Sequence, residues 1–366
     1  MASVAEFWHR IERSLFPCVA ENLGHALTEE LQSLVAILET LRIEEQRVYR
    51  PQQRVGRKLS DRAAIARAFV AKASLNLPDT LSLINRLRQD ASLRRILGWE
   101  QASQVPSEAT FSRAFAEFAL CSLGETVHQA LVSTYVGERI IGHISRDSTA
   151  IEARERPAVK PEKPKKPKPK KRGRPRKDEP PREPQPTRLE RQMKQTAEEA
   201  IAELPTLCDV GAKKNAKGYI SWWTGWKAHI DVADGGLPIT VLTTSASLHD
   251  SQAAIPMMKR TAGRVISLYD LMDSAYDAEP IHTVSRALNH RPIIAANKRR
   301  GEATPFDPAT ALRYNERTTA ERVNARLKDE FGGRNLRVRG HAKAHLHIMF
   351  GILALFADQL LLLARS

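Results

Sequence analysis

The amino-acid sequence predicts a mixed α/β sheet with flanking helices, preceded by an all-α N-terminal region and interrupted by a disordered basic insertion. Three observations carry this prediction. Residues 1–138 are rich in Ala and Leu, and their apolar positions recur at spacings of three and four. Residues 156–187 are rich in Lys and Pro. In the rest of the chain strand-like and helix-like segments alternate, which is typical of an α/β domain.

The length and charge of the chain limit its function. Its 366 residues are enough for two or three domains, and 57 Lys and Arg against 42 Asp and Glu leave a net charge of +15. Such a basic chain favours a polyanionic partner such as nucleic acid. The cysteines are three in number and far apart, which supports neither a disulfide framework nor a C-x-x-C metal knuckle and favours free thiols in a reducing cytosol: Cys18, Cys121 and Cys208.

The two ends of the chain predict no membrane segment. The first residues lack a basic leader followed by an apolar core, so we expect no secretory signal. The most apolar stretch, residues 347–364, is interrupted by Asp358 and Gln359 and is short for a membrane span. We therefore predict a buried C-terminal helix.

The helical N-terminal region contains one segment of interest, VPSEATFSRAF at residues 105–115. Ser107 is placed to cap a helix, Phe111 and Phe115 lie four apart on one face, and Arg113 lies on another. A short helix with a polar front is the element that helix-turn-helix proteins insert into a DNA groove. Amphipathic helices of bundles have the same pattern, so both interpretations stay open.

The basic insertion holds most of the net charge. Between residues 156 and 177 there are twelve Lys or Arg against one acid, which gives +11 of the total +15. Ten of the 21 prolines lie between residues 157 and 186, so we expect an extended, solvated tether. The tether contains the R-G-R-P core of an AT-hook, a peptide that lies in the minor groove of A·T-rich DNA: Arg172, Gly173, Arg174 and Pro175. The alternative is a basic linker that binds phosphates anywhere.

The segments around the tether predict the sheet and its helices. Expected strands lie at residues 139–147, 219–234, 237–246, 264–273 and 291–298, and expected helices at 247–262, 279–289 and 312–333. The tether follows the first strand. It must therefore loop out of the domain as an insertion.

Three acids in this region are candidates for chemistry. Asp147 and Asp273 each follow an apolar strand, where ligands commonly bind to open α/β sheets. Glu321 lies in the last of these helices, and three residues at offsets of −7, −4 and +7 share its helical face: Tyr314, Arg317 and Lys328. An aromatic ring, a carboxylate and two cations on one face suit a metal ligand flanked by phosphate-contacting groups.

With these residues the chain resembles the bacterial insertion-sequence transposases of the D-D-E type. The late helix matches their Y-x2-R-x3-E-x6-K signature at all four positions, and the likeness extends to GWKAHIDVADGGLPI, SLHDS and VPSEATFSRAF. The resemblance implies a ribonuclease-H-like catalytic domain at residues 139–364, a DNA-end-binding region at 1–138 and an inserted tether at 156–187. It also implies that the catalytic and metal-binding acids are Asp147, Asp273 and Glu321.

The resemblance further implies the reaction and its partners. Such an enzyme binds the ends of an insertion sequence, cleaves the DNA and joins the 3′-OH to target DNA, using two Mg²⁺ or Mn²⁺ ions. Its partners are double-stranded DNA and a second copy of the chain on paired ends, in the bacterial cytoplasm at the nucleoid. Besides the AT-hook core, the residues expected at the DNA are Tyr314, Arg317, Lys328, Lys227 and His229. Two other functions stay open: an inactive or domesticated DNA-binding protein, and a metal-dependent nuclease of the same fold.

Several assignments have a competing interpretation. Asp270 could replace Asp273, which we prefer because a small residue and Tyr276 follow it as they usually do in the family. Asp250 resembles a recurrent family position, but we expect it to cap the helix that begins at Ser251. Lys227 and His229 alternate on a strand that is either near the active site or simply exposed. Two further groups have a functional and a purely structural interpretation. The histidines are either metal ligands or ordinary helix residues, and the arginines are either DNA contacts or a solvated turn: His341, His345 and His347, and Arg334, Arg337 and Arg339.

Overall fold

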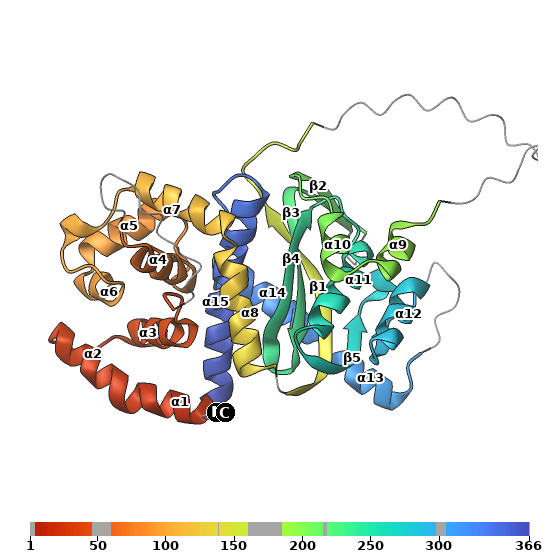
Figure 1. The fold of residues 1–366 in the computed structure, drawn as a ribbon, viewed down its shortest axis with the longest axis horizontal. Helices are drawn as coiled ribbons and strands as arrows, with labels where there is room; N and C mark the ends of the chain where they lie inside the picture. The colour runs from red at the N-terminus through yellow and green to blue at the C-terminus, as the bar shows by residue number, and fades with distance from the viewer. Residues whose placement is uncertain are drawn as a thin grey trace, which may run out of the picture.

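The structure, a computed structural model, describes residues 4–45, 60–137, 139–159, 185–214, 218–297 and 305–365. Its first part is helical, as predicted (Figure 1). Several helices begin at a side chain that accepts a hydrogen bond from the first turn, for example Thr28, Asp61 and Asp79. The helices are α1 (Val4–Arg10), α2 (Phe16–Leu23), α3 (Glu29–Leu41), α4 (Arg62–Ser74), α5 (Thr80–Gln89), α6 (Ala91–Ile96), α7 (Glu108–Leu120) and α8 (Leu123–Tyr135).

A mixed sheet of six strands forms the second part. The strands are β1 (Ile140–Glu152), β2 (Asp209–Lys214), β3 (Ile220–Ala233), β4 (Leu237–Ser245), β5 (Ile266–Met272) and β6 (Arg291–Ile294). Their order is β2-β3-β1-β5-β6, and β4 also pairs with β3. β3 is antiparallel to β1, β2 and β4, whereas β1, β5 and β6 run parallel. This mixed sheet with flanking helices is the ribonuclease-H-like arrangement that the sequence predicts.

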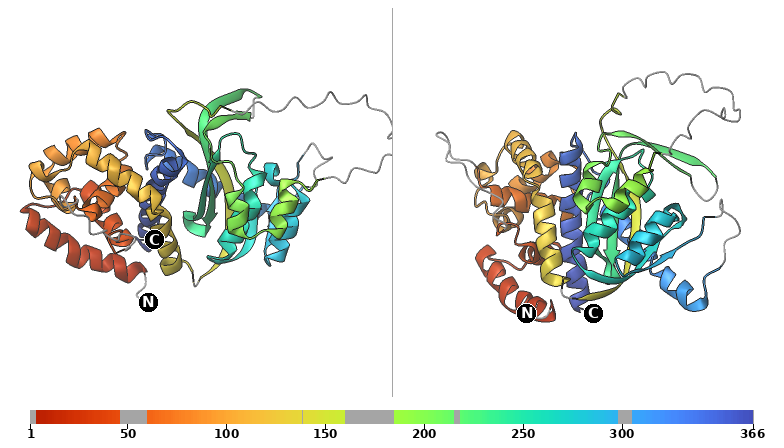
Figure 2. Two further views of the ribbon diagram at one scale, coloured as in Figure 1. Left: turned by 45° about the horizontal axis from the view of Figure 1, so that its top comes forward. Right: turned by 45° about the vertical axis from the view of Figure 1, so that its right-hand side comes forward.

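Helices cover both faces of the sheet (Figures 1 and 2). On one face α11 (Ser251–Ala262) and α12 (Glu279–Ala287) enclose an apolar cluster that includes Ile255, Met272 and Ile281. The short helices α9 (Arg188–Lys194) and α10 (Ala197–Ala202) pack on α11. The opposite face is covered by α14 (Thr318–Asp329) and α15 (His341–Arg365), and α13 (Pro308–Asn315) precedes α14.

The C-terminal helix α15 joins the two parts of the protein. Figure 1 shows it between the N-terminal helices and the sheet, and it contacts α3, α4, α7, α8 and β4. In the described part of the chain it is the one helix that is long and apolar enough to cross a membrane, yet 72% of its apolar window is buried inside the protein. The prediction of a buried C-terminal helix is therefore confirmed.

The sequence-based boundaries differ from the structure in several places. The strand expected at 291–298 ends at Ile294, the helix expected at 247–262 begins at Ser251, and α9 and α10 were not expected. β1 does not end at Asp147 but continues to Glu152, because its second half keeps pairing with β3 from Ser148↔His229 to Glu152↔Gly225. β2 was not expected; it forms by pairing with the first half of β3. The single helix expected at residues 312–333 is two helices, α13 and α14.

Candidate active site

The register of the sheet brings Asp147 and Asp273 side by side. β1 and β5 are parallel neighbours, and their last described pair is Ser145↔Leu271. Asp147 and Asp273 each lie two residues further along, so they are level on strands whose axes are about 4.8 Å apart. Asp273 follows the end of β5, where its side chain accepts a hydrogen bond from the Ala275 N–H at 2.9 Å.

The electrostatics of Asp147 reflect this position. Burial raises the pKa of its carboxyl to about 6, and the negative charge of Asp273 adds to the increase. Lys213 and Arg317 act in the opposite direction and favour the charged form. A partly desolvated carboxyl beside a second acid is a group that a bound cation would stabilise.

Helix α14 is held against β1 by hydrogen bonds at this point. The Asn324 Nδ2 donates to Asp147 Oδ2 at 3.0 Å, and the Ser145 Oγ donates to the carbonyl oxygen of Glu316 at 3.0 Å. Asn324 was not among the predicted residues. Its position three residues after Glu321, on the same helical face, is the signal that could have identified it.

Glu321, the third predicted acid, is paired with an arginine. The Arg317 Nη2 lies 2.7 Å from Glu321 Oε1, and the Glu321 side chain is 52% exposed. Among the residues that the structure describes, no group of three or more His, Cys, Asp and Glu is close enough to hold a metal ion. The structure therefore brings Asp147 and Asp273 together, with Glu321 nearby on α14 but engaged by Arg317.

The four signature residues do not lie on one helix, so that expectation was wrong. Tyr314 belongs to α13, whereas Arg317 precedes α14, and the Arg317 N–H bonds the Tyr314 carbonyl at 3.0 Å in a tight turn. Two hydroxyl groups donate hydrogen bonds to carbonyl oxygens of this turn: Ser145, from β1, donates to Glu316, and Thr318 donates to Asn315. These bonds favour the tight turn over a continuous α-helix. The Arg317 guanidinium still lies 5.7 Å from the centre of the Tyr314 ring.

Lys227 of β3 and Asp250, which directly precedes α11, form an ion pair. The Lys227 Nζ lies 2.8 Å from Asp250 Oδ1 and donates to the Leu248 carbonyl at 2.8 Å. Asp250 precedes α11, as expected, but its side chain makes no capping hydrogen bond, because it is bound to Lys227 instead. His229 is fully buried, bonds the Thr244 hydroxyl at 2.8 Å, and has its pKa lowered to about 4 by burial. It therefore supports the sheet as a neutral ring.

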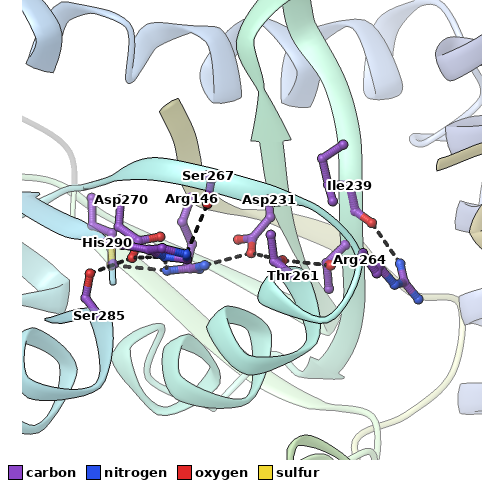
Figure 3. A network of polar contacts seen from close by, with 11 residues as sticks. Arg146, Asp231, Ile239, Thr261, Arg264, Ser267, Asp270, Ser285 and His290 are labelled. Atoms are coloured by element: carbon purple, nitrogen blue, oxygen red, sulfur yellow. Dashed lines mark hydrogen bonds and ion pairs between the residues drawn. The ribbon is translucent and has the colours of Figure 1, made fainter. Parts of the chain in front are cut away.

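A buried ionic network lies directly beneath β1 and β5 (Figure 3). The Arg146 Nη2 is 2.7 Å from Asp231 Oδ2, and its Nη1 is 3.9 Å from Asp270 Oδ1. Asp270 also accepts hydrogen bonds from Ser285 at 2.6 Å and His290 at 3.1 Å. Asp270 thus points into the protein and is fully engaged there, which favours Asp273 over Asp270 as the acid at the strand end.

Comparison with known families agrees with this arrangement. Residues 141–357, more than half of the chain, match the family described as "Transposase DDE domain". The chain belongs to the DDE transposase family. Residues 21–117 match a second family, "Transposase domain (DUF772)". A comparison with curated proteins finds no match.

The remaining predicted residues of the transposase lie away from the acids or outside the described residues. His341 and His345 bond Thr243, through its carbonyl and hydroxyl oxygens, and His347 bonds the Gly332 carbonyl, so all three are structural. On α7, Phe111 and Phe115 are buried and Arg113 is exposed, as expected, although Ser107 makes no capping hydrogen bond. The AT-hook core, residues 172–175, lies outside the described residues.

Proposed function

We propose that this transposase binds the ends of an insertion sequence, cleaves the DNA there and joins the freed 3′-OH to target DNA by metal-dependent phosphodiester transfer. The observation that carries the proposal is the level placement of Asp147 and Asp273 on neighbouring parallel strands, with α14 bonded to Asp147 through Asn324. That arrangement places two acids side by side on the sheet, next to the helix that carries Glu321.

The acids fit the divalent cations that the family generally uses. Asp147 and Asp273 would hold Mg²⁺ or Mn²⁺ through their oxygens, and Glu321 would join them by exchanging its Arg317 partner for an ion. The fit rests on the two adjacent carboxyl groups. Burial and the charge of Asp273 raise the pKa of the Asp147 carboxyl to about 6. A divalent cation supplies stabilisation of the charge that develops on the attacking and leaving oxygens, and two ions would do so on both sides of the phosphorus.

The proposed reaction comprises two balanced displacements at phosphorus. A water oxygen attacks the phosphodiester at the element end, the P–O3′ bond breaks, and the proton lost by water is matched by the one that the 3′-oxygen gains. The freed 3′-OH then attacks a target phosphodiester: a new P–O bond forms, the target's own P–O3′ bond breaks, and the proton lost by the attacking hydroxyl is matched by the one that the target 3′-oxygen gains. We assign contacts with the flanking phosphates to Arg317 and Lys328, with Tyr314 orienting Arg317, and indirect support of the site to Lys227 and His229.

In this proposal each part of the chain has its own role on DNA. We assign recognition of the element ends to the helical region at residues 1–138, catalysis to 139–364, and additional minor-groove or phosphate binding to the tether at 156–187. Two copies of the chain would act on paired ends of double-stranded DNA. This reaction takes place in the bacterial cytoplasm, at the nucleoid.

Cleavage and binding assays on the same protein preparations test the proposal. We expect Asp147→Asn, Asp273→Asn and Glu321→Gln each to abolish cleavage and joining while DNA binding survives, because the basic surface is unchanged. The matched control is Glu330→Gln, an exposed acid at the other end of α14. Normal cutting by Asp273→Asn with loss of cutting by Asp270→Asn would overturn the choice of second acid, and metal-dependent cutting without joined products would identify a nuclease instead.

A further inference from the structure

A cationic cavity lies between the N-terminal helices and the catalytic part, away from the acids. Its volume is about 530 Å³, within the range of ligand-binding pockets. Its walls come from α4, α5, α7, α15 and the segment 331–339 that follows α14. Four cationic side chains line it, and we call it the Lys72 cavity: Lys72, Arg337, Arg339 and Lys343.

Lys72 is the unusual residue of this cavity. Its residue surface is only 8% exposed, and in the described part of the chain no acceptor is hydrogen-bonded to its ammonium group. Burial, against the opposing charge of Asp79 and with a smaller contribution from Arg337, lowers its pKa to about 8. Asp79 is already engaged as the cap of α5, where it accepts from the Ser82 N–H and hydroxyl, each at 2.8 Å. A buried cation without a bonded partner is costly, so an anion in the cavity would stabilise it.

The surrounding charges and shape favour a phosphate as that anion. Arg337, Arg339 and Lys343 form no ion pair within the described residues, whereas the acids of the lining are only Asp79 and Glu108. Four phenylalanines also line the cavity, so part of its wall is apolar: Phe69, Phe115, Phe331 and Phe350. Arginine and lysine in a partly desolvated cavity are the groups that proteins use to bind phosphate oxygens.

The position of the cavity favours DNA as the source of that phosphate. Arg337 and Arg339 are exposed, so the cavity continues to the protein surface, where a polymer can pass. The segment that carries them follows α14 directly, and the other end of α14 carries Glu321. Beside the cavity, Asn76 donates to the Asp329 carbonyl at 2.7 Å and accepts from Asn335 at 3.1 Å, which holds the helical region to the end of α14.

We propose that the Lys72 cavity seats a backbone phosphate of the bound DNA, with Lys72 as its innermost ligand and Arg337 and Arg339 at the entrance. The proposal rests on the proposed function, because it requires that the transposase bind DNA. It adds a phosphate site at the contact between the helical region and the catalytic part. DNA bound there would touch both parts at once.

DNA binding as a function of salt concentration tests the proposal on the full chain. We expect Lys72→Met to weaken DNA binding about tenfold or more, since a hydrogen bond to a charged group is worth about 1.5–3 kcal/mol. The slope of log affinity against log salt should fall by about 0.9 for each phosphate contact that is lost. The double variant Arg337→Gln/Arg339→Gln should have the same effect, whereas Arg286→Gln, an exposed arginine on α12, should not. Unchanged affinity and slope in Lys72→Met would overturn the proposal.

Two further measurements make the outcome decisive. Lys72→Met should melt at or above the wild-type temperature, because it removes an unpartnered buried charge; if it fails to fold, the double variant of exposed arginines decides the question. In the second measurement, inorganic phosphate and dAMP are added separately to the wild type and to Lys72→Met. If either compound raises the melting temperature of the wild type only, and Lys72→Met binds DNA as well as the wild type does, the cavity binds a free anion and the DNA assignment is overturned. Lys72-dependent DNA binding without any cleavage would overturn the proposed function alone.

Discussion

Replacing Arg146 by Met tests whether the buried network beneath the active site holds the fold. Arg146 is 1% exposed, and its guanidinium lies between Asp231 and Asp270, which are equally buried. Methionine keeps an unbranched chain but leaves both carboxylates without their cation. Removing one partner of a buried ion pair costs about 3–5 kcal/mol. With a typical unfolding entropy per residue, a chain of 366 residues should then melt roughly 4–7 °C lower.

Denaturant and thermal unfolding of matched variants measure this effect. The control is Arg264→Met, which removes bonds to the Ile239 carbonyl at 2.7 Å and to Glu125 at 2.9 Å. Glu125 keeps a second partner in Arg260 at 3.5 Å, so the expected loss is only about 1–2 kcal/mol. Asp231→Asn in the Arg146→Met background should restore part of the stability, because it removes an uncompensated charge. If the double variant is no more stable than Arg146→Met, or if Arg146→Met costs no more than the control, the reasoning fails.

Three other changes have defined outcomes. Asn324→Leu removes the donor to Asp147 and should slow single-turnover cleavage about tenfold or more without weakening DNA binding, and an unchanged rate would deny Asn324 a positioning role. Arg317→Ala should lower the rate of strand transfer more than the affinity for the DNA ends, because only transition-state contacts affect the chemical step. An unchanged rate with saturating DNA would leave Arg317 with only its i,i+4 ion pair to Glu321, which is worth about 0.3 kcal/mol. Deletion of residues 160–184 should keep the melting transition and weaken DNA binding with a shallower salt dependence, whereas loss of cooperative melting would show that the segment is structural.

The sequence predicted the fold wherever one strand or helix carries its own pattern. β3 to β6 and helices α11 and α12 were expected close to where they lie, since their apolar residues alternate or recur within a single segment. β2 was not predicted, because residues 209–214 have no such pattern and become a strand only by pairing with β3. The second half of β1 depends on the same strand, so its extent is a tertiary property.

The candidate site was predicted less completely than the fold. Asp273 was predicted from its position after β5, which the structure confirms, whereas Asp147 lies within β1, two residues beyond the last pair with β5. The break between Tyr314 and Glu321 was not predicted, since one of its causes is a hydrogen bond from Ser145, which is remote in sequence. The bond of Asn324 to Asp147 and the ion pair of Lys227 with Asp250 are likewise contacts between distant segments. Spacing along α14 places Asn324 on the face of Glu321 but does not predict its partner.

The central place of α15 has a consequence for how the two parts of the protein unfold. Its 25 residues pack on α3, α4, α7, α8 and β4, so the helical region and the sheet share one buried helix. Residues of both parts and of α15 belong to a single hydrophobic cluster, for example Leu34, Ile230 and Phe356. Neither part can expose its side of α15 without opening the core of the other, so we expect the two parts to unfold as one cooperative unit.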